Sequence, residues 1–183
     1  MERLSLPRTV APGPTKPAVR AIVLRALDLD PDDHVVDVGA GTGAVSIEVA
    51  AVAERVTAIE RDPDRVAAIR ENVAADSVED TVTVVQAEAP EALPDGADAV
   101  FVGGTRNMAS VLDRIEEIGP RTVVLTAARL ETAVDAIEGF RERGFDPTIR
   151  RIAVGRGTDL AGETAIEPER PVYLLAGNPG EMA

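Results

Sequence analysis

Residues 35–43 read Val-Val-Asp-Val-Gly-Ala-Gly-Thr-Gly, a short valine-rich run that ends in alternating glycines. A run of β-branched residues that stops at glycine is typical of a buried strand. Glycine also allows a tight turn and a close approach of a ligand to the backbone. The segment therefore predicts a strand, a turn and the start of a helix. Ligands of open α/β sheets bind beyond the carboxyl ends of the strands, so this turn is the first candidate site.

Strand and helix patterns alternate along the rest of the chain. Strands are predicted at residues 35–38, 55–60, 81–86, 99–102, 122–127, 145–154 and 172–176, and helices at about 17–27, 44–53, 63–75, 108–118 and 130–143. This alternation predicts an α/β fold with a mostly parallel seven-stranded sheet and helices on both faces. The last two strands have no helix between them, so we expect an antiparallel pair at the edge. Residues 1–183 are expected to form one domain, with 1–15 as an extended arm.

The glycine turn alone does not identify its ligand, because residues 39–44 also fit the dinucleotide fingerprint Gly-x-Gly-x-x-Ala. Asp37 lies two residues before the first glycine, where a carboxylate can meet the ammonium group of a methionine moiety. Glu48 lies in the helix after the turn, where an acid does nothing for a pyrophosphate. Glu60 ends the next strand, where an acid accepts hydrogen bonds from ribose hydroxyls of either cofactor. Together these acids favour S-adenosylmethionine.

A further candidate contact follows the third predicted strand, where residues 86–90 read Gln-Ala-Glu-Ala-Pro. In a nucleoside pocket, an acid at this place can accept a hydrogen bond from the adenine amino group. Glu88 is the candidate, with the backbone of Ala89 beside it. The alternative is that Glu88 is a solvated loop acid.

The charge of the chain restricts its partners and its surroundings. Asp and Glu number 32 against 19 Lys and Arg, which gives a net charge of −13, and Lys16 is the only lysine. The chain is either an ordinary acidic protein or, as the lysine depletion favours, a halophilic one adapted to molar salt, where charges are screened over about 3 Å. A nucleic-acid partner is not expected, because binding nucleic acid needs a basic footprint.

Other absences in the composition narrow the chemistry. The chain has no cysteine and a single histidine, His34, which is expected in a solvated turn, so no metal site is predicted. No apolar run reaches about 18 residues and residues 1–7 lack an apolar signal core, so no membrane span is predicted and a cytoplasmic location is expected.

Four further segments carry a resemblance to a known family. They are Gly13-Pro14-Thr15-Lys16, residues 59–63 (Ile-Glu-Arg-Asp-Pro), residues 88–93 (Glu-Ala-Pro-Glu-Ala-Leu) and residues 101–104 (Phe-Val-Gly-Gly). With the glycine turn, residues 10–177 resemble the precorrin methyltransferases of cobalamin biosynthesis. The glycine turn is generic to class I methyltransferases, which have a Rossmann-like fold, whereas the arm and the Gly-Gly turn are more specific.

The resemblance implies an activity, an assembly and a set of contacts. The implied reaction is S-adenosylmethionine-dependent methyl transfer to carbon 15 of cobalt-precorrin-6B, with decarboxylation of the ring C acetate. A homotetramer and a separate enzyme for carbon 5 are also implied. By position, the implied cofactor contacts are Thr15, Gly39, Ala40, Gly41, Thr42, Gly43, Glu60 and Ala89.

Two segments depart from the family pattern. The usual Gly-Asp-Ala-Pro is here Ala-Glu-Ala-Pro at residues 87–90, so the acid at Glu88 reaches one methylene further. The usual Ser-Arg-Gly-Arg corresponds to Val-Gly-Arg-Gly-Thr at residues 154–158, which keeps Arg156 and loses a second arginine.

Cationic residues near the expected cleft are candidates for holding substrate carboxylates. These are Arg106, Arg156 and Lys16, because a guanidinium binds a carboxylate through two parallel hydrogen bonds and an ammonium binds it as a point charge. The turn at Gly103 and Gly104 is expected to border the substrate. No catalytic acid or base is assigned, since positioning alone can supply about 7–11 kcal/mol to a transfer of this kind.

Three alternatives remain open at this point. A class I methyltransferase with another small substrate would share every cofactor motif. An NAD-dependent oxidoreductase would share the glycine turn, but the chain lacks an obvious Tyr-x-x-x-Lys set. A cofactor-binding module without catalysis would bind the cofactor but show no turnover.

Overall fold

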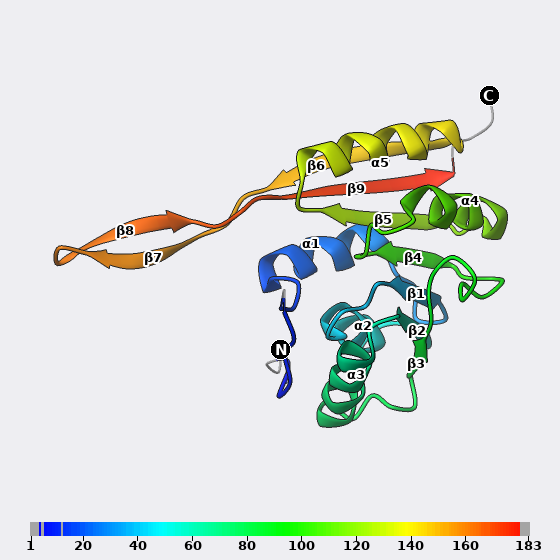
Figure 1. Cartoon of the computed structure of the whole chain (residues 1–183), viewed down its shortest axis with the longest axis horizontal. Helices are drawn as coiled ribbons and strands as arrows, with labels where there is room; N and C mark the ends of the chain where they lie inside the picture. The colour runs from blue at the N-terminus through cyan, green and yellow to red at the C-terminus, as the bar shows by residue number, and fades with distance from the viewer. Residues whose placement is uncertain (1–3, 5, 12, 180–183) are drawn as a thin grey trace.

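The computed structural model describes residues 4, 6–11 and 13–179. Within these residues, seven strands form one sheet in the order β3-β2-β1-β4-β5-β9-β6, and a separate hairpin, β7-β8, projects from it (Figure 1). The strands are β1 (His34–Val38), β2 (Arg55–Glu60), β3 (Val82–Gln86), β4 (Ala99–Val102), β5 (Thr122–Ala127), β6 (Phe145–Ile152), β7 (Gly155–Leu160), β8 (Glu163–Pro168) and β9 (Val172–Pro179). The helices are α1 (Pro17–Leu27), α2 (Ala44–Ala50), α3 (Pro63–Ala75), α4 (Met108–Ile118) and α5 (Leu130–Glu142).

The predicted sheet is confirmed, including its antiparallel edge. Strands β3, β2, β1, β4 and β5 pair in parallel, whereas β9 pairs antiparallel with both β5 and β6. Strand β9 therefore lies between β5 and the edge strand β6. The carboxyl ends of β1, β2, β3 and β4 consequently meet along one edge of the sheet, where a ligand site is expected.

Helices cover both faces of the sheet, which explains the continuous apolar runs of its central strands. Side chains of α1, α2 and α3 share one buried cluster with Ala99 and Phe101 of β4. Side chains of α4 and α5 share the other cluster with Val100 and Val102, the alternate residues of the same strand.

Local sequence signals set the start of α3. The Asp62 side chain accepts hydrogen bonds from the backbone N–H groups of Asp64 (2.9 Å) and Arg65 (3.3 Å), and Pro63 occupies the first helical position. Aspartate at the N-cap and proline at N1 are both favoured at helix starts. The predicted start of this helix is confirmed.

The hairpin β7-β8 was not predicted, and the strand predicted at residues 145–154 ends at Ile152. Almost every hairpin residue is exposed, so the alternating apolar pattern of a half-buried strand does not arise. Its two-residue turn, Ala161-Gly162, has positive φ at both positions, 56° and 84°, as a type I′ turn requires. Alanine is uncommon in this conformation, so the usual Asn-Gly signal is missing.

His34 also differs from the prediction of a solvated turn residue. It is the first residue of β1, only 6% exposed, and its Nε2 atom lies 2.8 Å from Thr57 Oγ1. Among the helices in the described part of the chain, none is long and apolar enough to cross a membrane.

Candidate functional site

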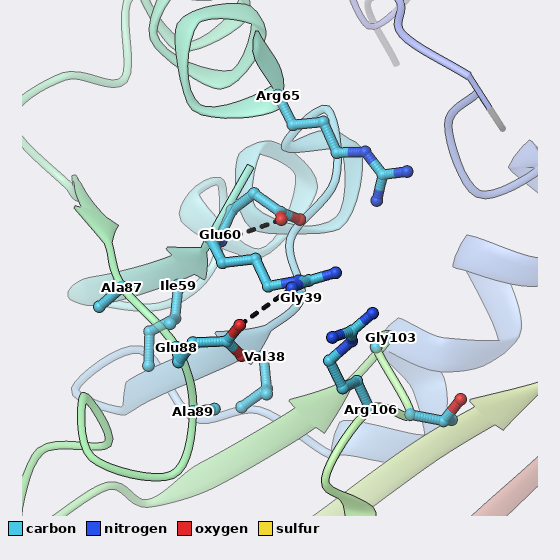
Figure 2. Close-up of a pocket in the computed structure, with 13 residues that line it drawn as sticks. Val38, Gly39, Ile59, Glu60, Arg65, Ala87, Glu88, Ala89, Gly103 and Arg106 are labelled. Atoms are coloured by element: carbon cyan, nitrogen blue, oxygen red, sulfur yellow. Dashed lines mark hydrogen bonds and ion pairs between the residues drawn. The ribbon is translucent and has the colours of Figure 1, made fainter. Parts of the chain in front are cut away.

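A cavity of about 210 Å³ lies at the carboxyl ends of β1, β2, β3 and β4 (Figure 2). Its wall includes Gly39, Glu60, Glu88, Ala89 and the turn from Gly103 to Arg106. The sequence predicted that four separate segments contribute to one site, and these segments do meet at this cavity.

The glycines at the end of β1 and β4 bring two backbone segments into close contact. A Cβ atom at position 39 would lie 2.7 Å from the Cα and N atoms of Gly104, and Gly39 has a φ of +73°. The N–H groups of Gly103 and Gly104 donate to Val38 O at 2.9 and 3.0 Å. Because no side chain separates these segments, backbone atoms form the floor of the cavity.

Glu60 is buried beside the glycine loop, with 5% of its surface exposed. Its Oε2 accepts from Gly41 N–H at 3.0 Å, and its Oε1 accepts from the N–H groups of Arg61 and Asp62 at 2.9 and 3.1 Å. A carboxylate has roughly four acceptor positions, so these bonds leave room on Oε2 for a ligand hydroxyl. The carboxylate is thus fixed in place before a ligand arrives.

Glu88 lies across the same cavity, but it is engaged by an arginine that sequence reasoning missed. Arg61 Nη1 donates to Glu88 Oε1 at 3.0 Å (Figure 2). Both side chains are nearly half exposed, and exposed ion pairs of this kind contribute only about 0–1 kcal/mol. Arg61 directly follows Glu60 in the sequence, which is the only signal that could have indicated it.

A second cavity of about 150 Å³ adjoins the first and shares Gly39, Arg65 and Gly103 with it. The glycine loop from Gly39 to Thr42 forms one wall. The arm from Gly13 to Thr15 forms another. Of the predicted cofactor residues, Thr15, Ala40, Gly41 and Thr42 therefore line this cavity. Gly43 is instead the N-cap of α2. A Cβ atom added at Gly43 would lie 3.1 Å from Ile69 Cγ2.

Arg20 of α1 holds the end of the arm. Its guanidinium, in a residue only 5% exposed, donates to the backbone oxygen of Thr15 and to Glu48 Oε1, the latter at 2.7 Å. Glu48, the acid predicted to disfavour a pyrophosphate ligand, is therefore the ion-pair partner of Arg20.

Asp37 is not among the described residues that line either cavity, so its predicted contact with an ammonium group is not supported by this arrangement. It is 1% exposed, and its Oδ2 accepts from Ser46 Oγ at 2.6 Å. Burial raises the pKa of Asp37 to about 7. The hydrogen bond from Ser46 lowers this pKa, and repulsion by the charge of Glu60 raises it further. All five residues of β1 are buried, and the bond to Ser46 turns the Asp37 side chain toward α2 and links that helix to β1.

The raised pKa of Asp37 predicts a pH-dependent cost to folding. Above about pH 4 the unfolded carboxyl loses its proton, whereas the folded one keeps it up to about pH 7. The unfolded state then binds fewer protons, so folding becomes less favourable as the pH rises. We expect the Asp37→Asn variant to gain stability relative to wild type between pH 4 and 7, by up to about 4 kcal/mol, with a constant difference above pH 7. Denaturant unfolding at several pH values tests this, and a difference that does not vary with pH would contradict it.

The predicted substrate residues fall into two groups. Arg106 lines the first cavity with Gly103 and Gly104, and its side chain has no hydrogen-bond or ion-pair partner within the described residues. Lys16 and Arg156 lie elsewhere, on either side of Glu169.

Glu169 joins these last two cations. Lys16 Nζ lies 2.6 Å from Glu169 Oε2, and Arg156 Nη2 lies 2.7 Å from Oε1. Hydrogen bonds from Lys16 and then Arg156 lower the pKa of Glu169. The cluster borders an open pocket beside the start of α1, which connects through Lys16 to the pocket lined by the arm and Gly103. Among the described residues, no group of three or more His, Cys, Asp or Glu side chains is placed to hold a metal ion.

Comparisons with known proteins agree with the resemblance noted in the sequence. Residues 13–177 match the family described as precorrin methyltransferase domain. A probable cobalt-precorrin-6B C(15)-methyltransferase (decarboxylating) of Halobacterium salinarum is 46% identical over 97% of this chain and 95% of its own length. Its counterpart from Methanosarcina acetivorans is 38% identical over 92% of this chain and 95% of its own length.

Solved structures give the same picture. The precorrin 8w decarboxylase of Methanobacterium thermoautotrophicum superposes with a TM-score of 0.86 at 34% identity, covering 91% of this chain and 92% of that one. A precorrin-6y C5,15-methyltransferase of Geobacter metallireducens superposes with a TM-score of 0.85 at 30% identity, covering 93% and 94%. An S-adenosylmethionine-dependent O-methyltransferase of Thermotoga maritima, at 14% identity and a TM-score of 0.79 over 96% of this chain and 68% of that one, shares the fold alone.

Proposed function

This chain belongs to the precorrin methyltransferase family, and we propose that it methylates carbon 15 of cobalt-precorrin-6B and decarboxylates the ring C acetate, with S-adenosylmethionine as methyl donor. The observation that carries the proposal is the Glu60 carboxylate, which Gly41 N–H fixes at 3.0 Å beside a cavity floored by backbone. An acceptor held in this way is suited to a ribose hydroxyl.

The residues present fit the proposed cofactor. S-adenosylmethionine supplies, when bound, a methyl group activated by the positive charge of its sulfur. Gly39 and Gly104 leave backbone, with no side chain, at the floor of the cavity. We place the adenosine half beside Glu60, Glu88 and Ala89, and the amino-acid half beside Thr15 and the glycine loop. The site residues Gly39, Ala40, Gly41, Thr42 and Gly43 shape this loop.

For the substrate, the chain contributes binding and orientation. Arg106, free of partners within the described chain, offers a guanidinium for an acetate or propionate arm of the macrocycle. Lys16 and Arg156 would add charge farther along, with Glu169 between them. The reacting carbon of the macrocycle is electron-rich, so a fixed geometry can replace a strong acid or base. The electrons left when carbon dioxide departs can enter the conjugated ring.

Calorimetric titration with S-adenosylhomocysteine, and separately with NAD, tests the cofactor in high salt. We expect binding of the former and none of the latter. Binding of NAD alone would reject the methyltransferase assignment. Turnover of cobalt-precorrin-6B with release of carbon dioxide then distinguishes the proposed enzyme from a methyltransferase with another small substrate and from a binding module without activity.

Replacing Arg106 by alanine is expected to reduce macrocycle turnover and leave cofactor affinity unchanged. The reason is that a hydrogen-bonded charge pair contributes about 1.5–3 kcal/mol, which corresponds to roughly a 10- to 150-fold loss of kcat/KM. Arg129→Ala, at the N-cap of α5, is the matched control. Wild-type kcat/KM in the Arg106→Ala variant would remove Arg106 from the substrate site.

Other features of the chain bear on its assembly and its surroundings. We propose that the chain acts as a single-domain homotetramer in the cytoplasm of a halophile, with a separate enzyme for carbon 5. The projecting hairpin exposes Leu160 and Ile166 by 65% and 70%, which supports self-association, and the net charge of −13 supports adaptation to salt. Light scattering in molar salt measures the mass of the assembly directly, and any mass other than that of a tetramer would reject the homotetramer.

A further inference from the structure

Asn72 occupies an unusual position in α3. It is fully buried, at 0% exposure, in the same helix as the core residues Ile69 and Val73. Asparagine has a low helix propensity, and burying its amide is costly unless hydrogen bonds compensate. Its presence therefore points to specific partners.

Those partners belong to two segments that are far apart in the sequence. Asn72 Oδ1 accepts from Arg8 N–H at 3.0 Å, and Asn72 Nδ2 donates to Arg8 O at 2.8 Å. Nδ2 also donates to Thr42 O at 2.9 Å. The amide thus bonds to both the N–H and the carbonyl of Arg8, as a neighbouring strand would. Through Thr42 O it also connects Arg8 to the glycine loop.

The arm runs beside α3 (Figure 1), and two more contacts from this helix reach it. Arg65 Nη2 donates to Ala11 O at 3.0 Å, and Glu71 forms an exposed ion pair with Arg8. Figure 2 shows the Arg65 side chain extending from α3 over the cavity. Exposed pairs contribute little, so among the contacts from α3 the buried amide of Asn72 fixes the arm most firmly, at Arg8, while Arg20 holds its end at Thr15.

These contacts join the two segments that form walls of the second cavity. Thr42 belongs to one wall and the arm continues from Arg8 through Ala11 to Gly13 and Thr15, which form the other wall. Asn72 itself is not among the described residues that line this cavity. Its amide therefore connects Arg8 of the arm with Thr42 of the glycine loop from outside the cavity.

We propose that Asn72 is a positioning residue for the amino-acid half of S-adenosylmethionine. This inference rests on the proposed function, because it assigns the second cavity to that half of the cofactor. Loss of the amide would let the arm move away from the glycine loop, while the adenosine half would keep its contacts at Glu60.

Two ligands separate this role from a general structural one. S-adenosylhomocysteine carries the amino-acid half, whereas 5′-methylthioadenosine ends shortly after the sulfur. We expect Asn72→Ala to weaken S-adenosylhomocysteine about tenfold or more and to change 5′-methylthioadenosine less than about twofold. Glu71→Gln, which removes only the exposed ion pair, is the control and is expected to bind both ligands as wild type does.

A pair of variants in the arm tests the same contact without altering the core. Arg8→Pro removes the N–H that donates to Asn72 Oδ1, and Arg8→Ala keeps it. We expect only Arg8→Pro to weaken S-adenosylhomocysteine selectively, by about threefold to tenfold.

Equal losses for both ligands, or unchanged affinity in Asn72→Ala and Arg8→Pro, would overturn the inference. Failure of the wild-type protein to bind S-adenosylhomocysteine would instead reject the proposed function, and this inference with it.

Discussion

Replacing Glu60 by alanine is expected to weaken S-adenosylhomocysteine binding on the order of 100-fold, since hydrogen bonds to a charged group contribute about 1.5–3 kcal/mol. The ligand loses an acceptor for its ribose. The protein also loses the partner of Gly41 N–H, so the glycine loop is no longer held at 3.0 Å from this side chain. Calorimetric titration of the folded variant measures the effect.

Two controls separate these contributions. Glu60→Gln keeps the shape and an acceptor oxygen but loses the charge and one acceptor oxygen, so we expect an intermediate loss. Glu88→Gln changes an exposed acid of the same cavity whose partner is Arg61, and a loss of less than about threefold is expected there. If Glu60→Ala binds the ligand as tightly as wild type, the cofactor does not use this cavity.

Replacing Gly39 by alanine is expected to cause the largest loss of stability. The new Cβ atom would lie 2.7 Å from the Cα and N atoms of Gly104, well inside the normal contact distance of about 3.5–4.0 Å. The left-handed backbone adds about 1–2 kcal/mol and overpacking about 1–3 kcal/mol, so a destabilisation of about 3 kcal/mol is expected. Because β1 and β4 must move apart at the cavity floor, S-adenosylhomocysteine binding should be lost as well.

Gly96→Ala is the matched control. Gly96 has a similar φ of +76°, but apart from its two chain neighbours no described residue has a heavy atom within 4 Å of the position of its Cβ. Its cost is therefore the backbone strain alone, about 1 kcal/mol, with no effect on ligand binding. Denaturant unfolding compares the two variants, and equal costs would show that the contact with Gly104 does not matter.

Much of the fold was predictable because its signals are local. The Asp62-Pro63 pair marks a helix start through bonds within three residues, and β2 and β4 begin and end at the predicted residues. The hairpin β7-β8 and the buried position of His34 were not predictable in this way. An exposed hairpin buries no periodic face, and His34 is buried by partners such as Thr57, which lies 23 residues away.

The same distinction between local signals and distant contacts applies to the candidate site. The glycine loop and the acid at the end of β2 could be predicted from the sequence, because a strand, a turn and an acid at that spacing constrain the backbone directly. By contrast, the folded chain was needed to show that Asp37 bonds to Ser46, that Arg61 pairs with Glu88 and that Asn72 joins the arm to the loop. These depend on contacts between residues distant in sequence, and no local pattern of residues encodes which distant backbone groups a buried side chain will meet.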